Sequence, residues 1–527
     1  MKLIFLLLML TPVALAQVSY ERIRGAAAEP EQWLTYSGNY QGHRHSLLKQ
    51  IDTSNVARLR PVWMYQMRDP GKVVTTPLVV DGVIYISEKP HAVSALDART
   101  GRPLWTYRRT VPPDVRACCG QPSRGVAILG DTLFMGTMDA RLVALDIRTG
   151  KPRWDVVVAD YKTGHSITVA PLVLKDKVIV GIAGGEYGIR GFLDAYDAKT
   201  GKQSWRFWTT PGPGEPGHDT WAGDSWKTGA APTWVTGVYD PELNLLYWGT
   251  GNPGPDWNGD TRAGDNLYSN CLLALNPDTG KLKWYFQFTP HDVHDWDANQ
   301  TPILIEGAID GRQRKLVITA NRNGFYYTLD RETGQFLRGA AFVKQTWAKG
   351  LDEKGRPVLL PGKEPSAEGT LLYPGIGGGT NWQSPAWNPQ TRLFYVMTED
   401  GRSHVYYKRP EDYHSGELFE GGGFRTQPGD EPPGAIKAIE PETGKIRWEY
   451  KTHSYSMAGV MSTAGGLVFG AAEGHFLALD AVSGKPLWNF QTGGRILANP
   501  VSWQLDGKQY VGISSALSFI VFALDEK

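Results

Sequence analysis

The chain has 527 residues, enough for two or three ordinary domains or for one large repeat fold. Its 19 Trp, 23 Tyr and 61 Gly suit many short strands joined by tight turns, because large rings fill the space between sheets. The formal net charge of +1 excludes a strong basic field, so we expect no nucleic-acid partner and no binding to anionic lipid.

The first sixteen residues are predicted to be a secretory signal. MKLIFLLLMLTPVALA combines a lysine, an apolar run and small residues at Ala14 and Ala16, and cleavage would precede Gln17. The alternative, a membrane anchor, needs about 20 apolar residues. Here Thr11 and Pro12 end the run earlier. We therefore predict an exported protein without a membrane span, located in a bacterial periplasm.

A motif that ends in tryptophan recurs along the rest of the chain. Its copies are ALDARTGRPLW, ALDIRTGKPRW, AYDAKTGKQSW, ALNPDTGKLKW, AIEPETGKIRW and ALDAVSGKPLW, which end at Trp105, Trp154, Trp205, Trp284, Trp448 and Trp488. A degenerate copy, TLDRETGQFL, covers 328–337, and the segment before Trp63 is a further candidate. We expect each copy to be strand, turn, strand, with the acid capping the turn, glycine at positive φ and tryptophan reaching the neighbouring sheet.

This repeat predicts an all-β fold, an eight-bladed β-propeller. A period of about 45 residues with short strands is typical of propellers, and the eight motif sites indicate eight blades. The chain ends on FALDEK, the start of another copy, and we expect this strand to pair with the segment around Leu48–Trp63 and close the ring. No linker separates a second domain, so 17–527 should be a single domain. Long loops on one face are expected at 211–226, 253–269 and 349–380.

The cysteines allow more than one pairing. Cys118 and Cys119 are adjacent, in a compartment that favours disulfides, and the only other cysteine is Cys271. The residues alone leave open a vicinal bond, which must distort the intervening peptide, two small buried side chains, or a bond between Cys119 and Cys271. Cys271 is otherwise expected to be a buried free thiol.

The segment TPHDVHDWDANQ carries the main candidate metal ligands, Asp295 and Asp297. On a strand, residues two apart project to the same side, so both carboxylates could meet one hard cation. Glu186, in IAGGEYG, and Asn252, in GTGNPGPDWN, are further oxygen donors in glycine-rich loops. The alternative is that these four residues are solvated or cap backbone amides.

Five other residues have both a functional and a structural interpretation. His291 and His294 could bind zinc, but a spacing of three suits a helix and this stretch is predicted as strand or loop, so packing or surface roles are favoured. Arg322, in ANRNGFYYTLD, could face an anionic ligand or form a surface salt bridge. Trp234 and Trp382 lie outside the repeat and could stack on a ligand or pack in the core.

From about residue 30 to its end, the chain resembles the methanol and ethanol dehydrogenases that depend on pyrroloquinoline quinone (PQQ). The family fold is an eight-bladed propeller with the repeat A-x-D-x-x-T-G-K-x-x-W. The resemblance implies that Cys118 and Cys119, in RACCGQPSRG, form a vicinal disulfide on one face of PQQ. It implies that Trp234, in GAAPTWVTG, lies on the other face. The remaining PQQ contacts that it implies are Arg124, Thr168, Gly184, Gly185, Arg322 and Asn381.

The resemblance also implies a metal site and a reaction. Glu186, Asn252 and Asp295 would bind the metal, and Asp295 would be the catalytic base, although His294 replaces the tryptophan that precedes it in the family. Two positions later, calcium enzymes carry Ala or Ser and lanthanide-dependent members carry Asp, here Asp297. Because an added carboxylate suits a trivalent ion, we expect a lanthanide, with Ca²⁺ as the alternative.

The implied reaction oxidises a primary alcohol to an aldehyde. The metal would polarise the quinone carbonyl, Asp295 would take the hydroxyl proton, and Arg322 would stabilise charge on the quinone oxygens. The chain has no CxxCH haem motif, so the implied electron acceptor is a separate cytochrome c. The sequence leaves open the preferred alcohol and whether the chain is a monomer or a homodimer.

Three departures from the family pattern leave the PQQ edge contacts and the substrate size open. Val74, in GKVVTTPL, replaces a glutamate contact, and Met457 replaces a tryptophan before AGV. The loop before the last strand is absent from SSALSFIVFALD. Two other functions fit the repeats: a noncatalytic propeller that scaffolds outer-membrane assembly, which needs neither the cysteine pair nor the aspartate pair, and a PQQ sugar dehydrogenase.

Overall fold

The computed structural model describes residues 17–525 except 70, 90 and 430–433, so the predicted signal at 1–16 lies outside the described residues. Within the described part, the strands form seven four-stranded sheets, one five-stranded sheet, one three-stranded sheet and one two-stranded sheet. The one α-helix found there, α1, is Tyr20–Arg24. None of the described helices is long and apolar enough to cross a bilayer.

Most four-stranded sheets are antiparallel, with their strands in chain order. β3 (Leu78–Val80), β4 (Val83–Glu88), β5 (Ala92–Asp97) and β6 (Pro103–Arg108) show the pattern, in which β3 to β5 are mostly buried and β6 is largely exposed. The next four sheets are β7 (Ala127–Leu129), β8 (Thr132–Gly136), β9 (Arg141–Asp146) and β10 (Pro152–Val157); β11 (Leu172–Leu174), β12 (Lys177–Gly181), β13 (Phe192–Asp197) and β14 (Gln203–Trp208); β15 (Val238–Asp240), β16 (Leu245–Gly249), β17 (Cys271–Leu275) and β18 (Leu282–Gln287); and β19 (Ile303–Ile309), β20 (Arg312–Ala320), β21 (Phe325–Asp330) and β22 (Phe336–Ala341).

The C-terminal third continues the pattern around two small inserted sheets, the second of which interleaves in sequence with the following four-stranded sheet. The inserted strands are β23 (Ala348–Leu351) with β24 (Pro357–Leu359), and β25 (Thr370–Leu372) with β28 (His404–Lys408) and β29 (Gly422–Thr426). The following sheets are β26 (Ala386–Asn388), β27 (Leu393–Thr398), β30 (Ala435–Ile439) and β31 (Ile446–Lys451), and β32 (Met461–Thr463), β33 (Leu467–Ala472), β34 (His475–Asp480) and β35 (Pro486–Gln491), with β1 (His45–Ser46) parallel to β32.

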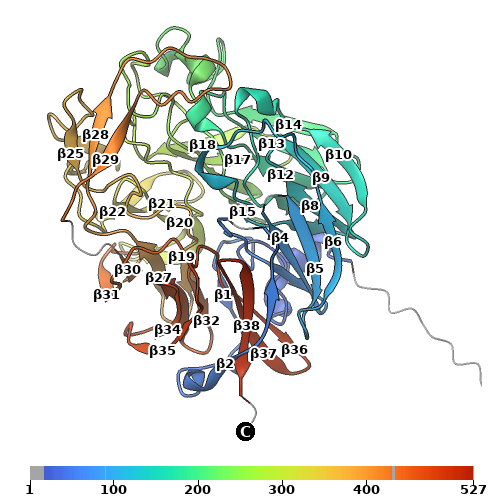
Figure 1. The fold of residues 1–527 in the computed structure, drawn as a ribbon. Helices are drawn as coiled ribbons and strands as arrows, with labels where there is room; N and C mark the ends of the chain where they lie inside the picture. The colour runs from blue at the N-terminus through green and yellow to red at the C-terminus, as the bar shows by residue number, and fades with distance from the viewer. Residues whose placement is uncertain (1–16, 70, 90, 430–433, 526–527) are drawn as a thin grey trace, which may run out of the picture.

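The last sheet joins the two ends of the chain, as the sequence predicts. β2 (Leu59–Gln66) lies antiparallel to β38 (Ser518–Leu524), from Leu59 opposite Leu524 to Gln66 opposite Ser518. β37 (Lys508–Ser515) and β36 (Val501–Leu505) complete the sheet. Figure 1 shows the blue β2 beside the red C-terminal strands. The pairing covers one edge of β38, so that edge is not left unpaired.

The tryptophan motif has the expected local structure. In the first copy, Asp97 Oδ1 accepts from the backbone N–H of Thr100 at 3.0 Å, and Gly101 has a φ of +74°. Trp105 Nε1 donates to the carbonyl of Ile147, in the turn of the next sheet, at 3.1 Å. The same type of bond runs from Trp154, Trp205, Trp284, Trp448 and Trp488 to the carbonyls of Ala198, Pro277, Arg331, Ala481 and Leu59. Each motif therefore attaches its sheet to the following one.

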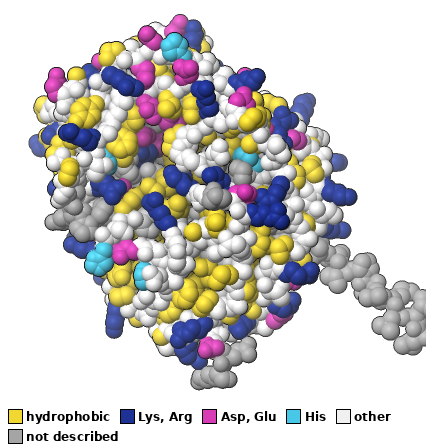
Figure 2. Space-filling model, in the orientation of Figure 1, with side chains coloured by type: hydrophobic (Ala, Val, Ile, Leu, Met, Phe, Trp, Pro, Cys, Tyr) yellow, Lys and Arg dark blue, Asp and Glu magenta, His cyan; other side chains and the backbone are white. Residues whose placement is uncertain are grey.

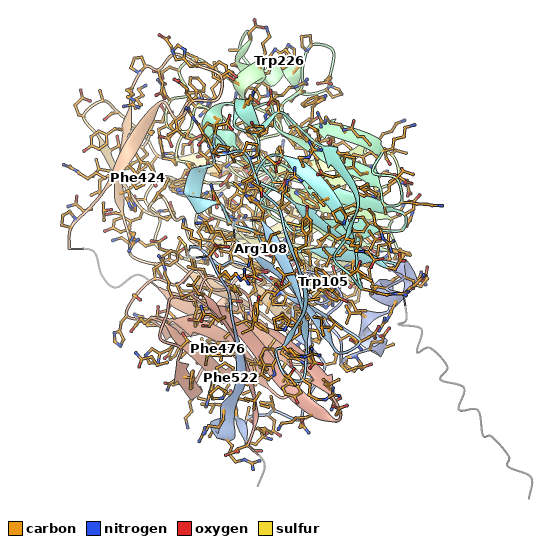
Figure 3. All side chains as sticks on the ribbon, turned by 45° about the vertical axis from the view of Figure 1, so that its right-hand side comes forward. Trp105, Arg108, Trp226, Phe424, Phe476 and Phe522 are labelled. Atoms are coloured by element: carbon orange, nitrogen blue, oxygen red, sulfur yellow. A yellow bond between two sulfur atoms is a disulfide. The ribbon has the colours of Figure 1, made fainter. Side chains whose placement is uncertain are left out.

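Apolar side chains fill the space between neighbouring sheets. Figure 3 shows Phe476 of β34 and Phe522 of β38 near one another, and their ring centroids are 5.6 Å apart. On the surface, basic and acidic side chains are interspersed over the face seen in Figure 2, in keeping with the small net charge. The sheets therefore share their apolar faces and leave charged groups outside.

The expectation of a long loop at 349–380 is wrong in part. This segment holds β24 and β25 and most of β23, and β23 and β24 form a hairpin around Gly355, whose φ is +79°. Gly355 packs so closely on Phe336 that a Cβ there would lie 2.4 Å from the ring. Glycine and proline in this segment therefore mark the turns of short strands. The other two segments hold no described strand, although 211–226 includes the 3₁₀ turn η6 (His218–Thr220) and the start of η7 (Ser225–Thr228).

Candidate active site

A cavity of about 320 Å³ brings most of the predicted site residues together. They come from loops that flank the sheets, which explains how residues far apart in the sequence meet. All the predicted site residues except Gly185 line it: Cys118, Cys119, Arg124, Thr168, Gly184, Glu186, Trp234, Asn252, Asp295, Asp297, Arg322 and Asn381. Gly185 is the first residue of the 3₁₀ turn η5 (Gly185–Tyr187), directly after Gly184.

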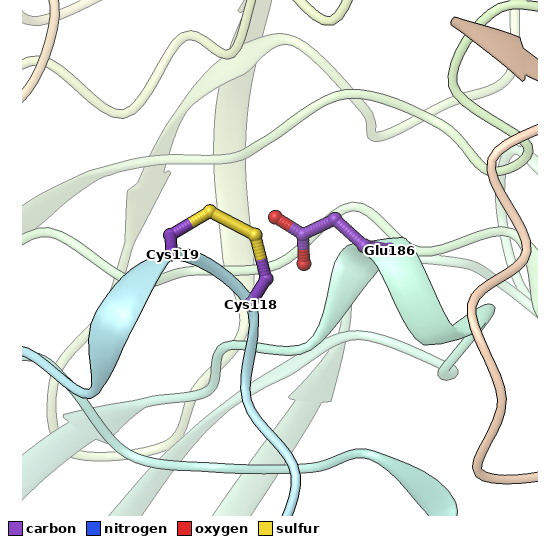
Figure 4. A group of neighbouring side chains, drawn as sticks. All are labelled: Cys118, Cys119 and Glu186. Carbon is purple, nitrogen blue, oxygen red and sulfur yellow. A yellow bond between two sulfur atoms is a disulfide. The ribbon is translucent and has the colours of Figure 1, made fainter.

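Cys118 and Cys119 are bonded to each other, and Cys271 is a buried free thiol. This excludes the alternative bond between Cys119 and Cys271. Figure 4 shows the carboxylate of Glu186 pointing toward the disulfide, and its oxygen and the two sulfurs lie within 4.8 Å of one another. Because both sulfurs are in a disulfide, they offer no thiolate to a metal. A metal bound at Glu186 would therefore need oxygen atoms as its other ligands.

Glycine positions Glu186 at the cavity. Gly184 has a φ of +120°, and a Cβ there would lie 2.2 Å from the carbonyl oxygen of Gly164. Only glycine fits this turn without displacing the backbone of Gly164. Burial raises the pKa of Glu186 to about 7, and the negative charges of Asp297 and Glu420 act in the same direction. A cation bound beside Glu186 would relieve both effects.

The segment with Asp295 and Asp297 is not a strand, so the strand argument from the sequence is wrong. No described strand lies between β18 and β19, and Asp295 has a φ of +57°. The carboxylate of Asp292 sets the local path, because it accepts from the backbone N–H of His294 at 2.9 Å and of Trp296 at 2.7 Å. Asp295 and Asp297 nevertheless both line the cavity.

Arg322 joins the two aspartates. Its guanidinium pairs with Asp297 through Nη1 and lies 3.2 Å from Asp295 Oδ2 through Nη2. The side chains of Arg322 and Asp297 are 5% and 6% exposed, and that of Asp295 is 24% exposed. Burial raises the pKa of Asp295 well above its usual range, and the charge of Arg322 opposes that shift. Arg322 is therefore a buried cation at the cavity, and the surface salt bridge considered from the sequence is excluded.

Backbone contacts fix Asp297 against the loop that carries Asn252. The N–H of Asn252 donates to Asp297 Oδ1 at 3.1 Å. Gly251 leaves room for this contact, since a Cβ there would lie 2.3 Å from the same oxygen. The side-chain nitrogen of Asn252 donates to Asp256 Oδ1 at 2.8 Å.

Asp256 is a site residue that the sequence reasoning missed. It lines the cavity, and burial raises its pKa well above the usual range, as do the charges of Asp295, Glu186 and Glu420. The signal was present in GNPGPDWN, because an acid four residues after a predicted ligand is within reach of it in a tight loop. Glu420 lines the same cavity and was also missed.

Another part of the cavity wall carries positive charge beside aromatic rings. Its rings are Trp234 and Trp382, whose centroids are 6.4 Å apart. The guanidinium of Arg124 lies 4.5 Å from the Trp234 centroid and donates to Thr168 Oγ1 at 2.9 Å. Its buried Nε has no hydrogen-bond partner in the described residues. Lys72, also missed from the sequence, lines the cavity, and its pKa is lowered by burial and by Arg495 and Arg124. Cations therefore gather near these rings.

These features fit a flat, anionic cofactor beside a hard cation. PQQ is a planar quinone with three carboxylates, and the cavity offers a disulfide, aromatic rings and the partly unpaired guanidinium of Arg124. Oxygen donors for a cation come from Glu186, Asn252, Asp295 and Asp297.

Some of the other residues considered from the sequence line this cavity, and the two histidines do not. Val74 and Met457, the two departures from the family pattern, both line it. Asn381 donates through Nδ2 to the carbonyl of Gly377 at 3.2 Å. The histidines considered for zinc do not line it: His294 stacks on Trp296 with ring centroids 4.3 Å apart, and His291 Nδ1 bonds the carbonyl of Gly264 at 2.9 Å. The two imidazoles thus have separate structural partners.

Known proteins resemble this chain over nearly its whole length. A family model described as PQQ, glucose/ethanol/alcohol dehydrogenase, β-propeller domain, matches residues 33–342 and 430–511. The quinoprotein alcohol dehydrogenase PedH of Pseudomonas putida is 42% identical, over 96% of this chain and 90% of that protein. The lanthanide-dependent methanol dehydrogenase of Methylacidiphilum fumariolicum is 38% identical, over 96% of this chain and 88% of that protein. A solved europium-containing methanol dehydrogenase has a TM-score of 0.91 and 34% identity, over 96% of this chain and all of that one.

Proposed function

This chain belongs to the quinoprotein alcohol dehydrogenases, oxidoreductases with PQQ and a β-propeller fold, and we propose that it oxidises primary alcohols to aldehydes with a lanthanide ion beside the cofactor. The observation that carries the proposal is the cavity lined by the Cys118–Cys119 disulfide, Trp234, Arg322 and the two aspartates. We further propose that the four- and five-stranded sheets are the eight blades of one propeller domain, residues 17–527.

The proposed metal ligands are Glu186, Asn252, Asp295 and Asp297, all on the cavity wall. Three carboxylates bring enough negative charge to balance a trivalent ion, whereas Ca²⁺ needs fewer. The lanthanide-dependent relative and the europium-containing structure support this choice. Ca²⁺ remains the alternative, and activity with each ion distinguishes them.

The proposed PQQ contacts are the disulfide on one face, Trp234 on the other, and polar groups at the edge. Arg124 would bind a carboxylate, because its Nε is buried without a partner. Thr168 holds that guanidinium at 2.9 Å, and Asn381 adds a side-chain amide. Gly184 and Gly185 allow the backbone to turn toward Glu186.

PQQ with its metal supplies the two-electron acceptor, and the side chains handle the proton. Asp295 is the proposed general base, which accepts the hydroxyl proton of the alcohol at its carboxylate. Arg322 donates to this carboxylate and so favours its ionised form. Arg322 also places a fixed positive charge at the cavity, where it would stabilise negative charge on a bound quinone.

Three further elements of the proposal concern the setting of the reaction. The substrate is a small primary alcohol, in line with the named activities of the relatives. We propose a separate cytochrome c as electron acceptor and the periplasm as the location, from the haem-free sequence and the signal-like first sixteen residues.

A reconstitution tests the proposal. The mature chain is loaded with PQQ and either La³⁺ or Ca²⁺, and reduction of an artificial dye by ethanol is followed, with glucose as the comparison substrate. Ethanol oxidation with La³⁺ is expected. Oxidation of glucose alone would favour the sugar dehydrogenase, and no oxidation with either ion would favour the noncatalytic scaffold.

A further inference from the structure

Asp256 is a buried carboxylate that no part of the proposed reaction uses. It is 2% exposed, lines the cavity, and forms no ion pair among the residues that the structure describes. A buried carboxylate without a cation is unfavourable, because neither water nor an opposite charge compensates it. Glu186, Asp295 and Asp297 line the same cavity, so the nearest groups include more negative charge. A cation in the cavity would be the natural counter-charge.

The hydrogen bond between Asn252 and Asp256 decides which way the Asn252 amide faces. The carboxylate oxygen Oδ1 of Asp256 accepts a hydrogen bond from the NH₂ end of the Asn252 amide, so this end of the amide faces Asp256. Asn252 Nδ2 indeed lies 2.8 Å from Asp256 Oδ1, and the same nitrogen lies 3.4 Å from the carbonyl of Pro253. Both acceptors, Asp256 Oδ1 and the carbonyl of Pro253, therefore face the nitrogen of the Asn252 amide. The side-chain oxygen of Asn252 is therefore the end left for a cation.

The contact between Asn252 and Asp256 forms within a single loop. Asn252 and Asp256 are four residues apart in a loop without strands, between β16 and β17. The backbone N–H of the same Asn252 is held by Asp297 Oδ1 at 3.1 Å. Main chain and side chain of Asn252 are thus fixed by two different aspartates, one of which is a proposed ligand.

We propose that Asp256 is a positioning residue of the metal centre, which holds the side-chain oxygen of Asn252 toward the ion and, through its own charge, favours a trivalent over a divalent ion. The inference rests on the proposed metal site. Partners of this type, which orient a ligand without touching the metal, typically change metal affinity by about 10–100-fold when they are removed.

Metal binding by the full mature chain tests the two roles separately. Tb³⁺ affinity is measured from luminescence sensitised by tryptophan, and Ca²⁺ affinity from competition with Tb³⁺. Asp256→Asn keeps an acceptor oxygen and removes the charge, whereas Asp256→Leu removes both. Asp260→Asn is the matched control, since Asp260 is in the same loop but forms an exposed ion pair with Lys408.

We expect Asp256→Asn to weaken Tb³⁺ binding by about tenfold and Ca²⁺ binding by less, so that the selectivity for Tb³⁺ falls. Asp256→Leu should weaken both ions further, because the amide of Asn252 is then free to turn. The control should bind Tb³⁺ as the wild type does, and thermal unfolding confirms that each variant is folded. Unchanged selectivity in Asp256→Asn, or equal affinities in the two variants, would overturn the inference. If the wild type itself bound no Tb³⁺, the proposed metal site would fail and this inference with it.

Discussion

Asp297 and Arg322 form an ion pair at the cavity in which both side chains are almost completely buried. The same guanidinium lies 3.2 Å from Asp295, so one cation holds both carboxylates of the HDWDAN segment. Removing one partner of a buried pair leaves an uncompensated charge, which is costly. We therefore expect the three side chains to act as one unit, because Asp295, the proposed base, and Asp297, the proposed metal-selecting residue, both pair with Arg322.

Asp295→Asn tests the base. The amide cannot accept the hydroxyl proton, so kcat for ethanol should fall by about 10²–10⁴-fold. The absorbance of bound PQQ after gel filtration shows whether the cofactor is retained. A kcat within tenfold of the wild type, with the cofactor bound, would assign the base to another residue.

Arg124→Met tests the anion-binding end of the cavity. A charged hydrogen bond to a carboxylate contributes roughly 1.5–3 kcal/mol, so PQQ should bind about tenfold to a hundredfold more weakly. Quenching of tryptophan fluorescence by added PQQ gives the dissociation constant. Arg99→Met is the control, because Arg99 forms an exposed pair with Asp506 on the surface. Equal affinities for PQQ in wild type and Arg124→Met would exclude the proposed contact.

Gly150→Ala tests how the repeats dock. Gly150 has a φ of +68°, and a Cβ there would lie 2.5 Å from the Trp105 ring. Gly507→Ala is the matched control, with a φ of +76° and no atom within 4 Å of the new Cβ. Both variants place alanine at a positive φ, which destabilises the fold. Gly150→Ala should lose roughly 1–3 kcal/mol more of the free energy of unfolding, because its Cβ clashes with the Trp105 ring. The two thermal unfolding midpoints give the comparison, and equal midpoints would contradict docking of Trp105 on this turn.

Glu399→Gln tests a pH effect outside the cavity. Burial raises the pKa of Glu399 from about 4.5 to about 7, although Arg402 and Arg322 oppose the shift. Between these values the folded chain holds the proton more tightly than the unfolded chain, so stability falls as the pH rises. The loss reaches at most about 3 kcal/mol above pH 7.

The glutamine variant cannot ionise and lacks this loss. Its thermal midpoint, relative to the wild type, should therefore rise between pH 5 and pH 8. Arg402→Gln removes a charge that opposes the raised pKa of Glu399, whose Oε1 lies 3.1 Å from Arg402 Nε, so the midpoint of this variant should fall more steeply with pH than that of the wild type. A midpoint difference that is the same at both pH values would contradict the raised pKa.

The parts of the fold that follow from short-range patterns could be predicted from the sequence. Each Thr/Ser-Gly turn is fixed by its own acid or asparagine, as Asp97 shows, and the tryptophan at the end of each motif predicted how the sheets attach. The β-propeller, the closure of the last sheet by β2 and β38, the free Cys271 and the membership of the quinoprotein alcohol dehydrogenases are confirmed. The roles of the individual site residues stay predictions.

What the sequence could not predict depends on the path of irregular loops. The sequence predicts a strand for Asp295, but the carboxylate of Asp292 accepts hydrogen bonds from the backbone and sets a different conformation. GNPGPDWN places Asp256 four residues after Asn252, but whether the two side chains meet depends on how the loop folds back. Lys72 and Arg124 lie far apart in the sequence, and the pairing of the loops before β3 and β7 brings them near one another. The family motifs identified residues that line the cavity, whereas the contacts between these residues could be seen only in the structure.

The most direct test concerns Asp297 and the choice of metal. Ethanol oxidation is measured for the wild type and for Asp297→Ala, each loaded with PQQ and saturating La³⁺ or Ca²⁺. We predict that the ratio of La³⁺-supported to Ca²⁺-supported kcat exceeds one in the wild type and falls at least about tenfold in the variant, because one carboxylate of the metal site is lost. A wild type active only with Ca²⁺, or an Asp297→Ala variant that keeps its full La³⁺ activity, would contradict the role of Asp297.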